Sequence, residues 1–304
     1  MKTGPECLPC IVRLVLETAR KVGSDAWLHK KVLLGALEQL PGADLERTPA
    51  EVLSDTIRAT MNVLGNVKAF DELKLRSTER VVRLEPRLRE GIDRSADPLQ
   101  AAVRLATAAN SFDALLLGTL DPDRVLEGIE SFVPAVDEYP AFRQALEKAK
   151  QVMYLFDNAG EALTDKLLLE RIAPGREITA VPRKSPLWND VGEEDLVSIG
   201  VDKLATIVNM GTDVMGAPVA LFSTEFRKRL DSAELVIAKG PANFECLEDT
   251  NVPAAFLFMV KCPRVAEVLE LAVGDGVVLM NRKKTGTRIL REGKGAHRAA
   301  AGGN

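Results

Sequence analysis

The sequence is poor in cysteine and histidine and has no marked excess of either charge sign. Its four cysteines are too few for a disulfide scaffold in a chain of 304 residues, and this usage fits a reducing compartment. The 40 basic and 44 acidic residues are interspersed and give a net charge of −4, so we expect no nucleic-acid partner. Neither of the two histidines, His29 and His297, lies in a pattern that favours a general base.

Long apolar runs and nucleotide fingerprints are also missing. No stretch approaches the 18 uncharged apolar residues of a membrane helix, and no apolar signal segment follows the first six residues. No strand is followed by a Gly-rich dinucleotide fingerprint, and no phosphate loop of the G-x-x-x-x-G-K-[ST] type occurs. We therefore expect a cytosolic protein without a membrane partner, and a nicotinamide-dependent or ATP-hydrolysing enzyme is disfavoured.

Residues 1–150 predict a helical N-terminal domain. Apolar residues recur at helical spacing after Pro9, and no strand pattern is visible. The segment from Thr48 to Glu51 is a capping-box pattern with proline at the first helical position. Further helices are predicted over 27–40, 71–92, 98–109, 122–132 and 140–149.

Residues 151–290 predict a Rossmann-like α/β/α domain with a mainly parallel sheet, because short apolar runs alternate with helical segments. The predicted strands are 152–156, 177–181, 205–208, 235–238, 254–260 and 276–280. Helices are predicted over 161–172, 193–199, 217–230 and 263–270. The Gly/Ala-rich residues 291–304 are expected to form a loose tail.

Polar residues follow five successive predicted strands. The five turns contain Asp157-Asn158-Ala159-Gly160-Glu161, Trp188-Asn189-Asp190, Asn209-Met210-Gly211-Thr212-Asp213, Lys239-Gly240-Pro241-Ala242-Asn243-Phe244-Glu245 and Lys261-Cys262-Pro263. Because the carboxyl ends of parallel strands meet at one edge of a sheet, these side chains should converge on one crevice.

The oxygen donors in these turns suit a hard divalent cation. Asp157, Asn158 and Asp190 favour Mg²⁺ or Mn²⁺, while Lys239 and Lys261 can balance phosphate charge. Each turn alone is equally typical of a helix cap, since Asp and Asn are standard capping residues. Their occurrence at successive strand ends favours a site that binds a phosphoryl group between metal and lysine.

Together, these turns and the segment Ser185-Pro186-Leu187-Trp188-Asn189-Asp190 resemble the metal-dependent damage-control phosphatases, a family first catalogued as a domain of unknown function. The Cys7-Leu8-Pro9-Cys10 segment and the segment Ala109-Asn110-Ser111-Phe112-Asp113 resemble its prokaryotic branch. The resemblance implies hydrolysis of phosphate monoesters of small metabolites, such as sugar phosphates or phosphopantetheine-like compounds, supported by Mn²⁺, Co²⁺, Ni²⁺ or Mg²⁺.

The resemblance also implies roles for individual residues. Asp157, Asn158 and Asp190 would be the metal ligands, and Asp157, Asp190 and Lys261 the catalytic residues, with Lys261 binding phosphate. Further candidates for substrate binding in the matched turns are Glu161, Gly211, Asp213, Lys239 and Asn243. Pro241 and Ala242 depart from the glutamine and glycine usual in the family, so the geometry of that turn should differ.

Several alternatives stay open at this point. An S-adenosylmethionine-dependent carboxyl methyltransferase and a non-catalytic metal- or metabolite-binding protein are the rival functions. Water or Asp157 itself could be the nucleophile, and Asn110 and Asp113 could contribute to the pocket or only pack helices. Cys7 and Cys10 could be packed thiols, a redox pair, or part of a structural metal site with Cys246 or Cys262. The physiological substrate and the oligomeric state are not specified by any pattern.

Overall fold

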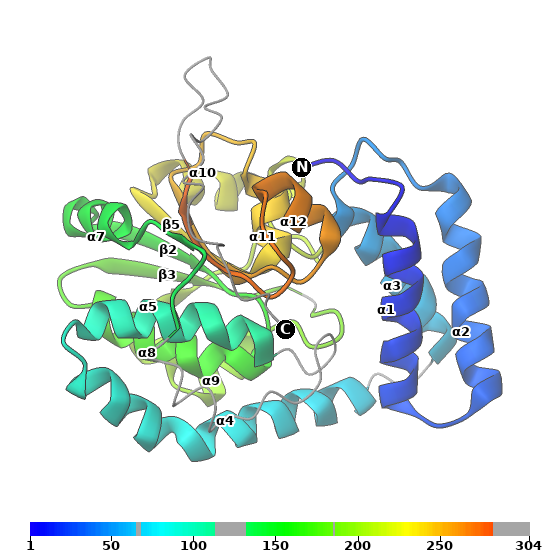
Figure 1. Ribbon diagram of the computed structural model, residues 1–304, viewed down its shortest axis with the longest axis horizontal. Coiled ribbons are helices and arrows are strands. Elements are labelled where there is room, and N and C mark those ends of the chain that lie inside the picture. The colour runs from blue at the N-terminus through cyan, green and yellow to red at the C-terminus, as the bar shows by residue number, and fades with distance from the viewer. Residues whose placement is uncertain (65–67, 113–131, 185, 282–304) are drawn as a thin grey trace, which may run out of the picture.

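The computed structural model describes residues 1–64, 68–112, 132–184 and 186–281 (Figure 1). Nearly all of the predicted helix 122–132 and the whole predicted tail 291–304, together with Asp113 and His297, lie outside these residues. The helices are α1 (Cys7–Val22), α2 (Ala26–Gln39), α3 (Pro49–Leu64), α4 (Lys68–Arg94), α5 (Pro98–Ala109), α7 (Tyr139–Lys148), α8 (Ala162–Ile172), α9 (Glu193–Ser198), α10 (Thr224–Ser232), α11 (Gly240–Leu247) and α12 (Pro263–Leu269). The strands are β1 (Val136–Asp137), β2 (Gln151–Leu155), β3 (Glu177–Val181), β4 (Thr206–Ile207), β5 (Leu235–Lys239), β6 (Ala254–Met259) and β7 (Gly276–Met280).

Helices α1, α2 and α3 form a helical lobe beside the sheet, drawn in blue in Figure 1. Their apolar faces share one core cluster with Ile11, Val15, Val32 and Ile57 at its centre. The predicted capping box at the start of α3 is present, since the Glu51 amide donates to Thr48 Oγ1 at 3.3 Å and the Thr48 amide donates to Glu51 Oε2 at 2.9 Å.

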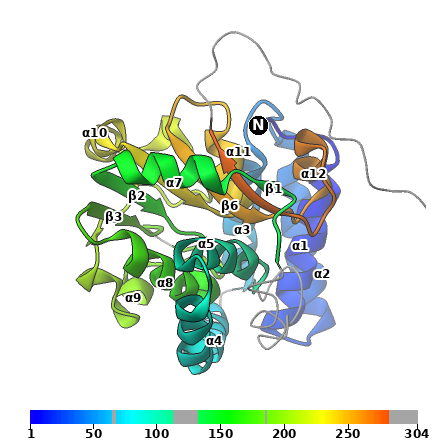
Figure 2. The same cartoon turned by 60° about the vertical axis from the view of Figure 1, so that its left-hand side comes forward.

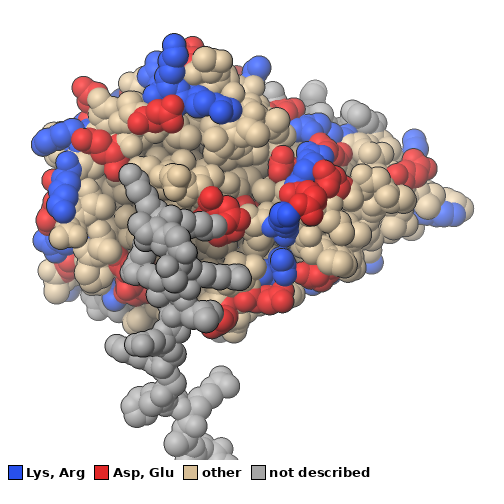
Figure 3. Space-filling model, turned by 90° about the horizontal axis from the view of Figure 1, so that it is seen from above, with Lys and Arg blue, Asp and Glu red and all other residues tan. Residues whose placement is uncertain are grey.

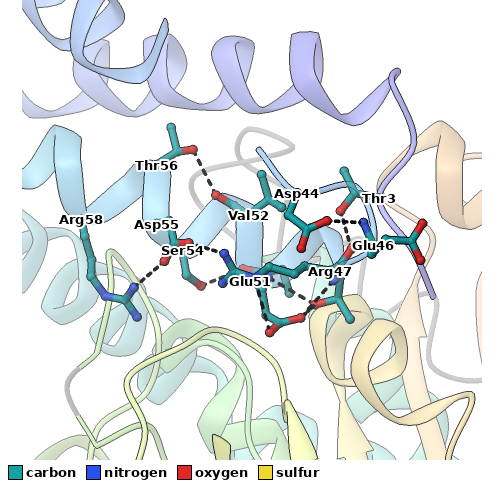
Figure 4. Close-up of polar contacts among 12 residues, drawn as sticks. Thr3, Asp44, Glu46, Arg47, Glu51, Val52, Ser54, Asp55, Thr56 and Arg58 are labelled. Carbon is teal, nitrogen blue, oxygen red and sulfur yellow. Dashed lines mark hydrogen bonds and ion pairs between the residues drawn. The ribbon is translucent and has the colours of Figure 1, made fainter. Parts of the chain in front are cut away.

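A row of ion pairs lies along α3 and the residue Arg47 before it (Figure 4). Arg47 and Arg58 contact Asp55 at 2.6 and 2.8 Å. Arg58 also contacts Asp213 at 2.9 Å, and Ser54 Oγ accepts a hydrogen bond of 2.9 Å from the Met215 amide. These contacts join the helical lobe to the loop after β4.

The sheet has the strand order β1-β7-β6-β5-β2-β3-β4. All neighbouring strands pair in parallel except β6 and β7, which are antiparallel. This confirms the predicted α/β class with a mainly parallel sheet. The expectation that residues 1–150 contain no strand is wrong, because Val136–Asp137 pairs with β7. Two residues are too short to produce an alternating pattern, and only a distant partner strand defines them.

Helices cover both faces of the sheet, as Figures 1 and 2 show for α5 and α8 on one side and α11 on the other. Side chains of α4, α5, α7, α8 and α9 share one core cluster with the sheet, and those of α10, α11 and α12 share the opposite cluster. Both faces are therefore buried, which is why the central strands are apolar throughout. Because α4, α5 and α7 cover the sheet, residues 1–150 divide between the helical lobe and the α/β layers. The boundary near residue 150 stays a prediction.

Acidic and basic side chains are intermixed on the face drawn in Figure 3. None of the helices in the described ranges is long and apolar enough to cross a membrane.

Strand β2 lies between β3 and β5. The chain continues from β2 to β3 on one side, whereas β5, which comes later, pairs on the other side. The loops after β2 and β5 therefore leave the sheet in opposite directions, and a crevice opens between them. Ligands of open α/β sheets bind at such a switch point.

Candidate functional site

A pocket of about 430 Å³ lies between the helical lobe and the carboxyl edge of the sheet. Four residues predicted for the site line it together: Asp157, Asn158, Asp190 and Lys261. They come from three loops, after β2, β3 and β6. The sequence-based expectation that these distant side chains meet in one crevice agrees with this geometry.

Backbone hydrogen bonds hold the β2 and β3 loops against each other. Asn158 and Asp190 form an isolated antiparallel bridge. The Ala159 amide donates to the Asn189 carbonyl at 2.9 Å, and the Val191 amide donates to the Asp157 carbonyl at 3.0 Å. The spacing between Asp157, Asn158 and Asp190 is thus set by main-chain contacts.

Gly240 lets the β5 loop approach Asp157 closely. Its φ is +79°, and a Cβ atom built on it would lie 2.0 Å from Asp157 Oδ2. Only glycine combines this left-handed conformation with the space that the carboxylate needs. The glycine of the predicted turn therefore makes room for the aspartate of the site.

Asp190 is buried, with 2% of its surface exposed, and its Oδ2 atom has no hydrogen-bond partner among the described residues. Burial raises the pKa of its carboxyl to about 7, an effect that nearby Arg183 opposes and the charge of Asp157 strengthens. Arg183 Nε lies 3.9 Å from Oδ2, beyond hydrogen-bonding range. A buried carboxylate oxygen that lacks a hydrogen bond and lies beside a second carboxylate is a strong acceptor for a cation.

These donors fit a hard divalent cation. Asp157, Asn158 and Asp190 offer carboxylate and amide oxygens and no sulfur or imidazole, the donor set that Mg²⁺ and Mn²⁺ prefer. No group of three or more His, Cys, Asp or Glu side chains in the described part of the chain is placed to hold a metal. The candidate site therefore depends on the amide of Asn158 as its third donor.

A chain of buried polar contacts supports Asp157 from behind. The amides of Asn110 and Asn158 both donate to Asp157 Oδ2, at 3.0 and 2.9 Å, and both donate to Glu161 Oε1, at 2.8 and 3.0 Å. Glu161 Oε2 pairs with Lys239, whose ammonium also contacts Asp165 Oδ1 at 2.7 Å. We call Lys239, Glu161 and Asp165 the buried triad.

The charges of the buried triad compensate one another. Burial acts to raise the pKa of Glu161, but Lys239 and Lys261 outweigh it, so the pKa lies below its usual range. Burial raises the pKa of Asp165 to about 7, with Lys239 opposing and Glu161 adding to the shift. For Lys239 the two carboxylates outweigh burial and raise its pKa. Lys261 lies near enough to Glu161 to act on its charge and lines the pocket.

Five predicted substrate-binding residues do not line the pocket. Lys239 and Glu161 are buried in the triad, and Asn243 is buried where its amide donates to the Phe156 and Lys239 carbonyls. Asp213 pairs with Arg58 of the helical lobe, and Gly211 turns the β4 loop with φ +82°. These five residues therefore stabilise the structure around the pocket. Their direct contact with substrate stays a prediction, because none of them is among the lining residues.

The alternation of side chains along the strands could have predicted which face of the sheet Lys239 and Tyr154 take. Leu235 and Ile237 face the α8 side of the sheet, so Lys239, two residues further along, faces α8 as well. By the same alternation Tyr154 faces α8, and its hydroxyl donates to Asp165 at 2.9 Å. Arg183, which is 2% exposed, lies two residues after the end of β3, and no sequence motif predicts its position beside Asp190.

Three of the four cysteines line the pocket: Cys7, Cys10 and Cys262. All four are free thiols. Burial raises the pKa of Cys7, and raises the pKa of Cys246 and of Cys262 to about 12, so these three thiols stay protonated at neutral pH. A protonated Cys7 thiol is a poor nucleophile, which disfavours a redox pair, and the structural metal site stays a prediction.

Comparisons with known proteins cover most of the chain. Residues 3–277 match the model of the damage-control phosphatase ARMT1-like domain. The chain is 28% identical over 291 residues to a damage-control phosphatase of Pyrococcus horikoshii, which covers 93% of this chain and 100% of that protein. It is 32% identical over 286 residues to a damage-control phosphatase of Archaeoglobus fulgidus, covering 91% of this chain and 98% of that protein. The crystal structure of a DUF89 family protein from Pyrococcus horikoshii superposes with a TM-score of 0.82, covering 93% of this chain and all of that one.

Proposed function

Because the chain belongs to the damage-control phosphatase ARMT1-like family, we propose that it is a divalent-metal-dependent phosphatase that hydrolyses phosphate monoesters of small metabolites. The observation that carries the proposal is the buried Oδ2 atom of Asp190, which has no hydrogen-bond partner among the described residues and lies beside Asp157 and Asn158 in a pocket. Sugar phosphates and phosphopantetheine-like compounds are the candidate substrates, and metabolite repair is the candidate role.

Asp157, Asn158 and Asp190 would hold the cation, and Mn²⁺, Co²⁺, Ni²⁺ and Mg²⁺ are the candidates. When bound, such a cation supplies Lewis-acid polarisation of a phosphoryl oxygen. The bridge between the β2 and β3 loops fixes the relative positions of these three residues, so the cation site would be preorganised. Positioning of this kind accounts for most of the catalysis in phosphoryl transfer.

Lys261 lines the same pocket and would neutralise the charge on the phosphoryl oxygens. Attack on phosphorus comes from water or from Asp157. Oδ2 of Asp157 already accepts two amide hydrogen bonds, which lowers its nucleophilicity and favours water. The stereochemistry at phosphorus separates the two, because direct attack by water inverts a chirally labelled phosphoryl group, whereas two successive displacements through a phospho-aspartate retain its configuration.

The buried triad acts as a positioning device. Lys239 holds Glu161, and Glu161 and Asp157 share the amides of Asn110 and Asn158. Outer residues that orient metal ligands typically change metal affinity or activity 10–100-fold when removed. The methyltransferase alternative is not favoured, because the relatives are phosphatases by name and the paired aspartates would have no purpose in it.

The experiment is phosphate release from a generic aryl phosphate, with and without each candidate metal. We expect metal-dependent activity that falls at least ~100-fold in Asp157→Ala and in Asp190→Ala. Asp231→Ala, an exposed aspartate on α10, is the matched control and should keep full activity. Equal activity in all four proteins, or none with any metal, would overturn the assignment.

A further inference from the structure

The pocket is larger and more apolar than a phosphate group requires. Its volume of about 430 Å³ falls in the range of pockets that enclose a whole small organic ligand. Besides the four polar residues of the site, the lining includes Ile11, Leu14, Leu53, Trp188, Met215 and Pro241. The helical lobe and the loops of the α/β layers both contribute to this apolar wall.

Trp188 is held in this wall at a conformational cost. Its φ is +53°, a left-handed value that a bulky side chain rarely adopts. The turn is closed by a hydrogen bond of 3.0 Å from the Asp190 amide to the carbonyl of Leu187, the residue before Trp188. The side chain is 5% exposed and packs in the core cluster of the helical lobe. A glycine would suit this turn better, so the indole must serve a purpose beyond the turn itself.

The indole of Trp188 also has an unused donor. Its Nε1 atom is buried and finds no hydrogen-bond partner within the described residues. Buried donors without partners are uncommon. Because this atom has almost no accessible surface, the part of Trp188 that the pocket wall offers to a ligand is apolar.

Two arginines of the lining have partners outside the four-residue phosphate site. Arg264 pairs with Glu6 at 3.5 Å and with Glu267 at 2.8 Å, and Arg13 reaches Cys10 Sγ at 3.9 Å. Most hydroxyl groups of a polyhydroxylated ligand would lie against Ile11, Leu53 and the other apolar side chains, where they would find no hydrogen-bond partners. Unpaired polar groups of this kind weaken binding, whereas apolar groups gain from leaving water.

We propose that the pocket selects phosphate monoesters whose alcohol part is apolar, aliphatic or aromatic, and discriminates against polyhydroxylated sugar phosphates. The phosphate sits among Asp157, Asn158, Asp190 and Lys261, as in the proposed function on which this inference rests. The apolar part of the ester lies against Trp188 and the side chains of α1 and α3.

The first test compares kcat/KM for phenyl phosphate and glucose 6-phosphate. The expected preference for the phenyl ester is at least ~10-fold. Leu53→Asn should reduce that preference through a higher KM for the phenyl ester, with kcat nearly unchanged. Leu34→Asn, on the exposed face of α2, is the matched control and should leave the ratio unchanged. A preference for the sugar ester, or a ratio that Leu53→Asn does not move, would overturn the inference.

The second test measures binding without turnover. The chain has two tryptophans, and Trp27 is 75% exposed, so Trp27→Phe leaves Trp188 as the only indole reporter. Phenylphosphonate should quench or shift its fluorescence at a concentration ~10-fold lower than inorganic phosphate does. This result in a protein without phosphatase activity would reject the proposed function and keep the ligand class. Equal affinity for the two probes would reject the ligand class even in an active phosphatase.

Discussion

Replacing Lys239 by Met removes the only cation of the buried triad while keeping the volume of the side chain. Lys239 is fully buried, with its ammonium 2.7 Å from Asp165 and in contact with Glu161, so the change leaves two buried carboxylates uncompensated. Breaking a buried ion pair by removing one partner costs about 3–5 kcal/mol in the free energy of unfolding. At about 2–4 °C per kcal/mol, we expect the melting temperature to fall by roughly 6–20 °C.

The loss of stability should depend on pH in a defined direction. The pKa of Asp165 is already raised to about 7 and would rise further without Lys239. The pKa of Glu161, which Lys239 helps to hold below its usual range, would rise as well. A carboxyl whose pKa is higher in the folded than in the unfolded protein destabilises the fold above its unfolded pKa, and the penalty disappears as pH falls. Lys239→Met should therefore lose less stability at pH 5 than at pH 8.

Denaturant unfolding at both pH values, with Lys228→Met as control, measures these effects. Lys228 is exposed on α10, so its replacement should change the free energy of unfolding by less than about 0.5 kcal/mol. Addition of Asp165→Leu to Lys239→Met should restore part of the lost stability, because it removes one unpaired charge. A loss below about 1 kcal/mol for Lys239→Met, or a loss that grows as pH falls, would refute the reasoning.

Three further changes test other parts of the structure. Gly240→Ala introduces a Cβ that would lie 2.0 Å from Asp157 Oδ2, so kcat should fall at least ~10-fold in a phosphate-release assay. The fall should be larger than in Gly175→Ala, because a Cβ at Gly175 meets no atom within 4 Å. Asp97→Ala removes the N-cap of α5 and should cost about 1 kcal/mol in unfolding at pH 7. Burial acts to raise the pKa of Asp97, but its hydrogen bonds and nearby Arg143 outweigh burial and lower the pKa. The loss of unfolding free energy in Asp97→Ala should therefore fade as pH falls below the usual carboxyl range, and a loss that stays constant with pH would contradict this. Asp213→Ala should leave KM unchanged, because Asp213 pairs with Arg58 outside the pocket, and a KM increase of ~10-fold would return it to the substrate site.

The sequence predicts the α/β half well because its strands are buried on both faces and have unambiguous patterns. The predicted ranges 177–181 and 276–280 coincide with β3 and β7. The short strand β1 escapes detection, because two residues carry no periodicity and depend on pairing with a strand about 140 positions later. Residues whose pattern is local are thus predictable, and those that depend on a distant partner are not.

The site divides in the same way. Asp157, Asn158, Asp190 and Lys261 follow strands directly, and the rule that strand ends converge places them in one pocket. That rule does not say which face of the sheet a strand-final side chain takes. The sequence therefore predicts Lys239 as a phosphate ligand. In the structure, the pleat of β5 directs the Lys239 side chain toward α8 and the buried carboxylates of Glu161 and Asp165.

The central claim is that Asp157, Asn158 and Asp190 form a divalent-metal site. Calorimetric titration of the purified protein with Mn²⁺ tests it without reference to any substrate. We expect one binding site per chain, with affinity at least ~100-fold weaker in Asp190→Asn and in Asp157→Asn, and unchanged in Asp231→Asn. Equal Mn²⁺ affinity in the wild-type protein and Asp190→Asn would contradict the account.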